Sequence, residues 1–250
     1  MTAETGTVSE RLQTGAAKDR NQQALEVLAQ LRVENCICIV GSGLSRTDGA
    51  YPSWEVLVEG LCRNCGVDSG LFNLGDTDDL LDAADACKCK DEASYARTLG
   101  EMIGQRATVP TVYYRLVRLP FQYFMTVNFD GCLLDALRSR DESIMPHVYP
   151  DLEPAEHAPS LYYLHGLVTG HGQTHVVLSR SEFAEAYDGE HGHCSVFLRS
   201  VLPYRNAVFI GWQMREPDTE RLVTMIKRMR DAVRSACRSS VQHILLLPTI

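Results

Sequence analysis

Three short segments carry side chains that could bind or transform a ligand, and each follows an apolar run. Gly41 to Ser45 comes after the run at 36–40, Asn128 and Asp130 follow a second run, and His165 ends a third. Glycines let a ligand approach the backbone closely, and phosphates usually bind at a glycine turn that follows a strand. An Asn side chain both donates and accepts hydrogen bonds, and a neutral imidazole can act as a general base. The three segments predict a site for a phosphate-containing ligand that can also move a proton.

Each segment also has a purely structural explanation. The glycine turn could end a strand without a ligand, Asp130 could cap a helix expected at 131–139, and His165 could be a hydrogen-bonded core residue. The G-x-G-x-x-G fingerprint of dehydrogenases lacks its third glycine, because Arg46 stands there. A hydride-transferring dehydrogenase is therefore a poor fit.

A fourth segment repeats the arrangement of an apolar run that ends in glycine. Gly211 follows such a run, Trp212 stands beside it and Asp218 is close in sequence. Trp212 could form the wall of a site for a base or a ribose, or it could belong to the core. The first glycine turn is followed by Pro52 and Trp54, which we place in a loop near the site.

Hydrophobic periodicity predicts the elements that must position these segments. Strands are expected at 36–40, 122–127, 161–164, 175–178, 207–210 and 243–247. Helices are expected at 22–32, 54–62, 78–87, 92–106, 111–117, 131–139, 181–187, 195–201 and 219–237. Strands that alternate with helices indicate an α/β fold with a mostly parallel, Rossmann-like sheet and helices on both faces. We expect a flexible tail at 1–22 and one domain at 23–250, with an inserted helical lobe at about 63–118.

Composition narrows the class of protein. The 250 residues are 45% hydrophobic, and 32 acidic against 24 basic side chains give a net charge of −8. Such a balance argues against nucleic-acid binding, which needs clustered Lys and Arg. The sequence shows neither a signal peptide nor an apolar run of about 20 residues, so we expect a cytoplasmic protein whose nine cysteines are mostly free thiols. The end at Ile250, directly after an expected strand, suggests a fragment of a longer polypeptide.

Two clusters contain possible metal ligands, but we expect no metal at either. Cys62, Cys65, Cys87 and Cys89 could form a four-thiolate zinc site, although Cys-x-Cys is an unusual pair. The tract from His191 through His193 to Cys194 could bind a metal, but a polar loop is favoured.

Five motifs, in this order, resemble the sirtuin-like family. The family pattern is Gly-Ala-Gly-x-Ser after a strand, then Pro-x-aromatic, Asn-x-Asp, Leu-His-Gly, and Gly-aromatic with a nearby Asp. The chain has Gly41-Ser-Gly-Leu-Ser45, Pro52-Ser-Trp54, Asn128-Phe-Asp130, Leu164-His-Gly166, and Gly211-Trp212 with Asp218. The resemblance spans about residues 35–250. It departs from the pattern at Ser42, where the family has Ala, and at Gln213, where it often has Ser.

One departure points to a branch of the family. Protein-deacylating sirtuins usually carry two Cys-x-x-Cys pairs after Leu-His-Gly, which form a zinc ribbon. Between His165 and Phe209 this chain has only Cys194. The segment 127–137, VNFDGCLLDAL, is similar to the bacterial antiphage-defence branch, whose members destroy NAD+ under the control of a sensing domain or a partner.

The resemblance implies an NAD+ hydrolase that cleaves the nicotinamide–ribose bond, with NAD as its substrate. His165, Asn128 and Asp130 would be catalytic. The residues expected to hold the dinucleotide are Gly41, Ser42, Gly43, Ser45, Pro52, Trp54, Gly211, Trp212 and Asp218.

Two other functions stay open: an NAD-dependent lysine deacylase, and a catalytically silent module that binds NAD or ADP-ribose. Because unregulated NAD+ loss would kill the host, we expect weak or autoinhibited activity that a homo-oligomer or a partner protein controls. We expect no direct contact with nucleic acid or with a membrane.

Overall fold

The computed structural model describes residues 32–49, 51–104, 108–155, 158–169, 175–188, 191–211 and 243–246, together with positions 22, 26, 29 and 30. Its centre is a six-stranded sheet in the order β3-β4-β2-β1-β5-β6, and every pair of neighbours is parallel. The strands are β1 (Cys36–Val40), β2 (Tyr123–Thr126), β3 (Pro146–Val148), β4 (Ser160–Tyr163), β5 (Asn206–Ile210) and β6 (His243–Leu246). The predicted α/β, Rossmann-like architecture is confirmed.

The strand register gathers the sequence motifs at one edge of the sheet. Val40 pairs with Thr126 on one side and with Ile210 on the other, and Thr126 pairs with Tyr163. The four strands that precede the motifs therefore end at the same level. Whatever follows each strand must emerge at the carboxyl edge, where ligands bind in sheets of this kind.

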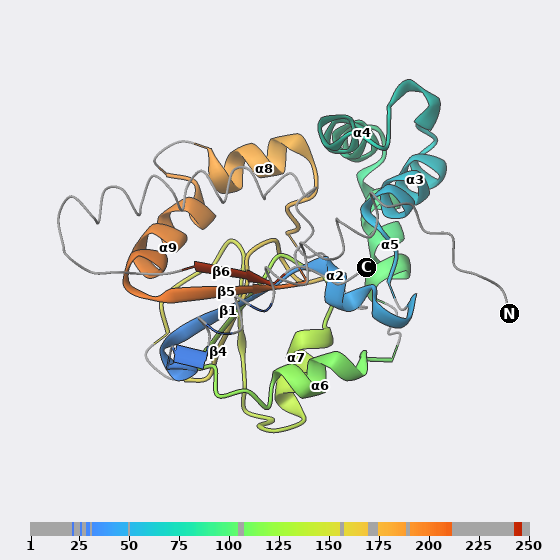
Figure 1. Ribbon diagram of the computed structural model, residues 1–250. Helices are drawn as coiled ribbons and strands as arrows, with labels where there is room; N and C mark the ends of the chain where they lie inside the picture. Colours follow the sequence, from blue (N-terminus) through green and yellow to red (C-terminus); the bar gives the residue numbers. More distant parts are fainter. Residues whose placement is uncertain are drawn as a thin grey trace, which may run out of the picture.

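Helices cover both faces of the sheet (Figure 1). On one face lie α8 (Arg180–Tyr187) and α9 (His193–Val201), and on the other lie α6 (Thr111–Leu116) and α7 (Cys132–Arg138). Side chains alternate along a strand, so β1 sends Ile37 and Ile39 into the first core and Cys36, Cys38 and Val40 into the second. All five residues of β1 are fully buried, as expected of a strand covered on both faces.

A third core lies in a helical lobe beside the sheet (Figure 1). It is built by α3 (Trp54–Cys65), α4 (Thr77–Lys90) and α5 (Glu92–Leu99), which continues as a π-helical turn at Gly100–Gly104. Ser53 caps the start of α3 by accepting a hydrogen bond from the Val56 N–H, and Gly66, with φ of +70°, ends it in the left-handed region. The division into a tail, a domain and an insertion at 63–118 stays a prediction.

Two expectations about strands were wrong. No strand forms at 175–178; the chain there runs irregularly across Gly166, and Val177 donates one hydrogen bond to the His165 carbonyl. Strand β3 was not expected, since it has three half-buried residues and begins with Pro146. Of the helix expected at 22–32 the structure describes four isolated positions and Arg32, and the helix expected at 219–237 lies outside the described residues.

Candidate active site

A pocket opens at the carboxyl edge of the sheet, between β1, β2 and β4 and the start of the helical lobe. Seven residues expected from the sequence line it, namely Ser42, Ser45, Pro52, Trp54, Asn128, Asp130 and His165. Its other walls are Arg46, Tyr51, Leu57, Ile103, Val127 and Phe129. The cavity has a volume of about 40 Å³. Small-molecule sites usually have about 300–1,000 Å³, so a dinucleotide would extend well beyond this pocket.

Asn128 lines the pocket, is buried, and is held by three hydrogen-bond partners. Its Nδ2 donates to Ser45 Oγ at 3.0 Å, to the Tyr113 hydroxyl at 3.1 Å and to the Gly41 carbonyl at 3.3 Å. A backbone carbonyl can only accept, so the nitrogen of the carboxamide must face Gly41. The oxygen Oδ1 then faces the other way. Within the described part of the chain this buried oxygen meets no hydrogen-bond donor.

Asp130 is buried, and its carboxylate is held by two donors. Ser45 Oγ donates to Oδ2 at 2.6 Å, and the Cys132 N–H at the start of α7 donates to Oδ1 at 2.9 Å. Asp130 therefore binds the first N–H of α7 as well as the glycine turn, although the N-cap residue of that helix is Gly131. Burial raises the pKa of the carboxyl group, while these two hydrogen bonds oppose the shift.

His165 is completely buried among aromatic rings. Its ring centroid lies 6.3 Å from that of Phe129 and 5.2 Å from that of Phe183, and its Nε2 lies 2.6 Å from the Tyr187 hydroxyl. Desolvation lowers the pKa of the imidazole from 6.5 to about 3. The imidazole is therefore neutral, as a proton acceptor must be, but its pKa is far below the near-neutral value expected from the sequence.

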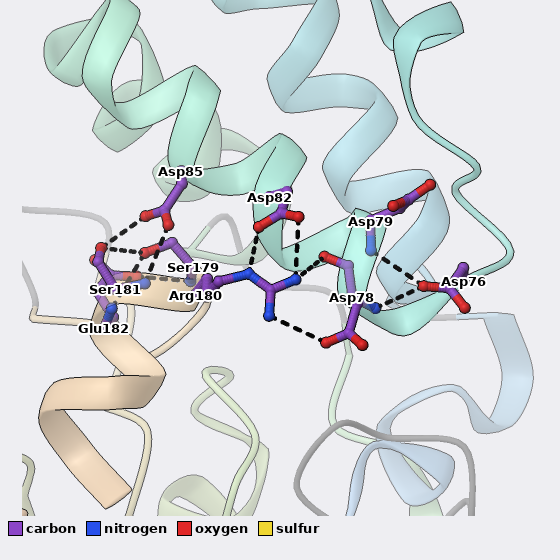
Figure 2. A network of polar contacts seen from close by, with 9 residues as sticks. All are labelled: Asp76, Asp78, Asp79, Asp82, Asp85, Ser179, Arg180, Ser181 and Glu182. Carbon is purple, nitrogen blue, oxygen red and sulfur yellow. Dashed lines mark hydrogen bonds and ion pairs between the residues drawn. The ribbon is translucent and has the colours of Figure 1, made fainter. Parts of the chain in front are cut away.

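Helix α8 supplies two of the side chains around His165, and its start is anchored on the helical lobe (Figure 2). The Arg180 guanidinium pairs through two nitrogens with the Asp82 carboxylate of α4 and also binds Asp78. The hydroxyl and the N–H of Ser181 both donate to the Asp85 carboxylate. Helix α4 thus presents acidic groups at three successive turns to the start of α8. This network connects the lobe to α8, the helix whose Phe183 and Tyr187 contact His165.

The turn after β1 approaches the turn after β5 very closely. The N–H of Gly43 donates to the Gly211 carbonyl at 2.8 Å, and a Cβ on Gly43 would lie 2.5 Å from the same oxygen. Gly211 has φ of +68°, and a Cβ there would meet Leu44. The two glycines are therefore required for the meeting of the turns as well as for any approach of a ligand.

Trp54 is the first residue of α3, as the helix expected at 54–62 predicts, and it is not part of a loop over the site. Its ring stacks on Phe129 at a centroid distance of 6.5 Å and lies 6.2 Å from the ring of Phe183. Trp54 therefore forms a fixed aromatic wall that continues to His165. Pro52 lies in the irregular stretch just before it.

Some expected residues do not contribute to the pocket or are not described. Trp212 and Asp218 lie outside the described residues. Cys62, Cys65 and Cys87 are buried and Cys89 is exposed; the Sγ atoms of Cys62 and Cys87 are 3.6 Å apart. The eight cysteines in the described ranges are free thiols. Those ranges also contain no group of three or more His, Cys, Asp or Glu side chains that could hold a metal, and no helix long and apolar enough to cross a membrane.

Tyr113 and Tyr187 contact Asn128 and His165, and sequence reasoning missed both. Each stands at a position where an amphipathic helix turns an apolar face inward, so the sequence pattern does not mark it as a site residue. A buried tyrosine usually needs a partner for its hydroxyl, which is the one signal that could have drawn attention to them.

These observations define an α/β domain of the Rossmann-like class whose site combines a glycine turn, a buried Asn-x-Asp pair and a histidine at neighbouring strand ends. A family model described as "SIR2-like domain" matches residues 122–249, about half of the chain, and the protein belongs to this family.

Similar proteins are found among curated sequences and solved structures. The chain is 23% identical to the NAD(+) hydrolase ThsA of Enterococcus faecium over 201 residues, which cover 77% of this chain and 40% of that protein. It is also 23% identical to the NAD(+) hydrolase ThsA of Cytobacillus dafuensis over 216 residues, which cover 84% and 42%. The chain therefore spans about two fifths of the length of these relatives. A structure titled "Structural Basis for the Mechanism and Regulation of Sir2 Enzymes" aligns with a TM-score of 0.45 at 14% identity, over 90% of this chain and 91% of the other.

Proposed function

We propose that this domain hydrolyses NAD+ to nicotinamide and ADP-ribose. The relatives of similar sequence are named NAD(+) hydrolases, and Asn128, Asp130 and His165 line one pocket. In the reaction the bond between C1′ of the ribose and the nicotinamide nitrogen breaks, and its electron pair goes to nicotinamide. The oxygen of a water molecule bonds to C1′ and gives up one proton.

The orientation of Asn128 carries the proposal. Its Nδ2 is engaged by the protein, which leaves the buried oxygen Oδ1 as an acceptor without a donor among the described residues. Burying an acceptor without a hydrogen-bond partner costs free energy. A ligand that donates a hydrogen bond to Oδ1 removes this cost, which favours its binding. A ribose hydroxyl and a nucleophilic water are both suitable donors. Either contact would place C1′ or its attacking water beside Asn128 in the pocket.

His165 would receive the proton that the reaction releases. The burial that keeps its imidazole neutral also makes it a weak base in the empty pocket. The diphosphate of the substrate brings negative charge to the glycine turn, and negative charge nearby raises the pKa of an imidazole. We infer that His165 becomes an effective base only when the substrate is bound.

The other residues of the pocket would bind the substrate. Gly41 to Ser45 would bind the diphosphate, as glycine turns after strands commonly do. Asp130 would hold Ser45, which in turn touches Asn128. Trp54 would shield the reacting ribose from bulk water, since its ring joins the aromatic wall around His165.

The biological setting is proposed on the resemblance alone. We propose an effector of antiphage defence that depletes NAD+ in the cytoplasm. A homo-oligomer or a partner protein would control the activity, because constitutive loss of NAD+ would be lethal to the host.

Product analysis tests the proposal. The protein, alone and with cell extract, is incubated with NAD+, and nicotinamide, ADP-ribose and cyclic ADP-ribose are quantified by chromatography. We expect equal amounts of nicotinamide and ADP-ribose from the wild type and none above background from Asn128→Ala or His165→Ala. Asn64→Ala is the matched control, because it removes a carboxamide that bonds Thr98 in the lobe, away from the pocket. Full activity in both site variants would refute the proposal. It would also be refuted if nicotinamide were released only when acetylated peptide is added, with O-acetyl-ADP-ribose as the second product.

A further inference from the structure

Tyr113 reaches the candidate active site from a helix that carries none of the sequence motifs. Its side chain is fully buried, and its ring packs in the core between the sheet and helices α6 and α7. Its hydroxyl lies 2.6 Å from Ser45 Oγ and 3.1 Å from Asn128 Nδ2. Helix α6 therefore delivers one polar atom to the place where the glycine turn meets the catalytic asparagine.

The direction of each hydrogen bond in this cluster follows from the number of available hydrogens. When Asp130 is ionised its carboxylate can only accept, so the single hydroxyl hydrogen of Ser45 must point to Asp130. The oxygen of Ser45 is then an acceptor, and the Tyr113 hydroxyl must be the donor in the contact between them. The oxygen of Tyr113 still has a lone pair, which accepts from Asn128 Nδ2. The bonds form one directed chain from Asn128 through Tyr113 and Ser45 to Asp130.

This series of hydrogen bonds leaves only one orientation for the Asn128 carboxamide. Rotating the Asn128 amide by half a turn would place its oxygen against the oxygens of Tyr113, Ser45 and Gly41. The Gly41 carbonyl has no hydrogen to offer. The hydroxyl hydrogens of Ser45 and Tyr113 are already donated to Asp130 and to Ser45, respectively. In the rotated state Oδ1 therefore gains a donor only if Tyr113 withdraws its hydrogen from Ser45, and Nδ2 loses all of its present bonds.

We propose that Tyr113 is a positioning residue, whose hydroxyl holds the Asn128 carboxamide with its oxygen toward the substrate. The inference rests on the proposed function for its catalytic consequence and on the hydrogen-bond geometry alone for its structural part. Phenylalanine would fill the same space in the core, so the packing of Tyr113 does not require the hydroxyl. The hydroxyl matters through Ser45 and Asn128.

Kinetics of Tyr113→Phe test the consequence. Without the hydroxyl, Ser45 loses a donor and Asn128 loses an acceptor, and we expect kcat for nicotinamide release to fall about tenfold, on the order of one buried hydrogen bond. We expect KM to stay within about twofold, since the backbone of the glycine turn proposed to bind the diphosphate is unchanged. Tyr163→Phe is the matched control. It removes another fully buried hydroxyl in the same core, one that accepts from the Leu134 N–H, and we expect unchanged kcat.

A second measurement tests the orientation without any turnover. The side-chain NH₂ signals of Asn128 are recorded by ¹⁵N NMR and assigned by their loss in Asn128→Asp. We expect these signals to shift and to exchange faster with solvent in Tyr113→Phe, and to be unchanged in Tyr163→Phe. Unchanged signals in Tyr113→Phe overturn the inference. If the wild type is active, a kcat of Tyr113→Phe equal to that of the wild type also overturns it. If the wild type releases no nicotinamide either alone or with cell extract, the proposed function fails, and the NMR result alone decides the role of Tyr113.

Discussion

The buried neutral imidazole of His165 makes a quantitative prediction about stability. Its pKa is about 3 in the folded protein and 6.5 without burial. A basic group with a lowered pKa in the folded state stabilises the fold above its unfolded pKa, and this contribution is lost as the pH falls. In the window from 6.5 to 3 the unfolded chain takes up a proton that the folded chain refuses.

The size of the effect follows from the two pKa values. Each pH unit below 6.5 costs about 1.4 kcal/mol until the folded imidazole itself begins to titrate. Between pH 7 and pH 5 the wild type should therefore lose about 2 kcal/mol of unfolding free energy through His165 alone. The variant His165→Gln has no titrating group at this position and should keep this part of the unfolding free energy.

Urea unfolding of both proteins at pH 7, 6 and 5 gives the test. All other titrating groups are common to the two proteins, so the difference between their pH dependences isolates residue 165. We expect the wild-type curve to fall more steeply, by about 2 kcal/mol over this range. Parallel curves would mean that His165 takes up its proton as easily in the folded state as in the unfolded state, and would refute the desolvated site.

Three further substitutions, the last with a matched control, test other parts of the structure. Asp130→Asn should lower activity. Its stability relative to the wild type should nevertheless rise between pH 4 and pH 7, because the raised pKa of the buried wild-type carboxyl makes ionisation in the folded state costly as the pH increases. Urea titrations at the two pH values would show no such trend if the carboxylate is well solvated. Arg180→Ala should destabilise the protein by about 1 kcal/mol at low salt, with a smaller difference in 1 M NaCl; a salt-independent loss in thermal unfolding would argue against the ionic contact. Gly43→Ala should lower the free energy of unfolding by more than about 2 kcal/mol, because its Cβ would strike the Gly211 carbonyl. The control Gly100→Ala has open space around the new Cβ and should be neutral or slightly stabilising. Equal melting temperatures of the two variants would contradict the close approach.

The sheet could be predicted largely from the sequence. Strand β1 has the predicted bounds, because five consecutive apolar residues followed by glycine have few alternatives when both faces of a sheet are covered. The segment at 175–178 contains three consecutive apolar residues, but it passes close to Gly166, where a Cβ would lie 1.9 Å from the His175 carbonyl. That close approach depends on tertiary packing and leaves no periodicity in the sequence. Strand β3 is short and half-buried, and an edge strand of this kind carries little pattern.

The candidate site could be predicted at the strand ends but not beyond them. Parallel strands in register bring Gly41, Asn128 and His165 to one edge, so their proximity follows from topology. Tyr113 and Tyr187 come from covering helices, and which helix residue faces a strand end depends on helix placement that local sequence does not determine. The low pKa of His165 was missed for the same reason, since it arises from neighbours on other elements.

Nicotinamide release from NAD+ is the most direct test of the proposed chemistry. Wild type, Asn128→Ala and Asn64→Ala are compared at equal concentration, and folding of each is checked by circular dichroism. We predict that the wild type and Asn64→Ala release nicotinamide and ADP-ribose in equal amounts, and that Asn128→Ala keeps its fold and releases neither. Undiminished release by a folded Asn128→Ala would contradict the assignment of this pocket as the active site.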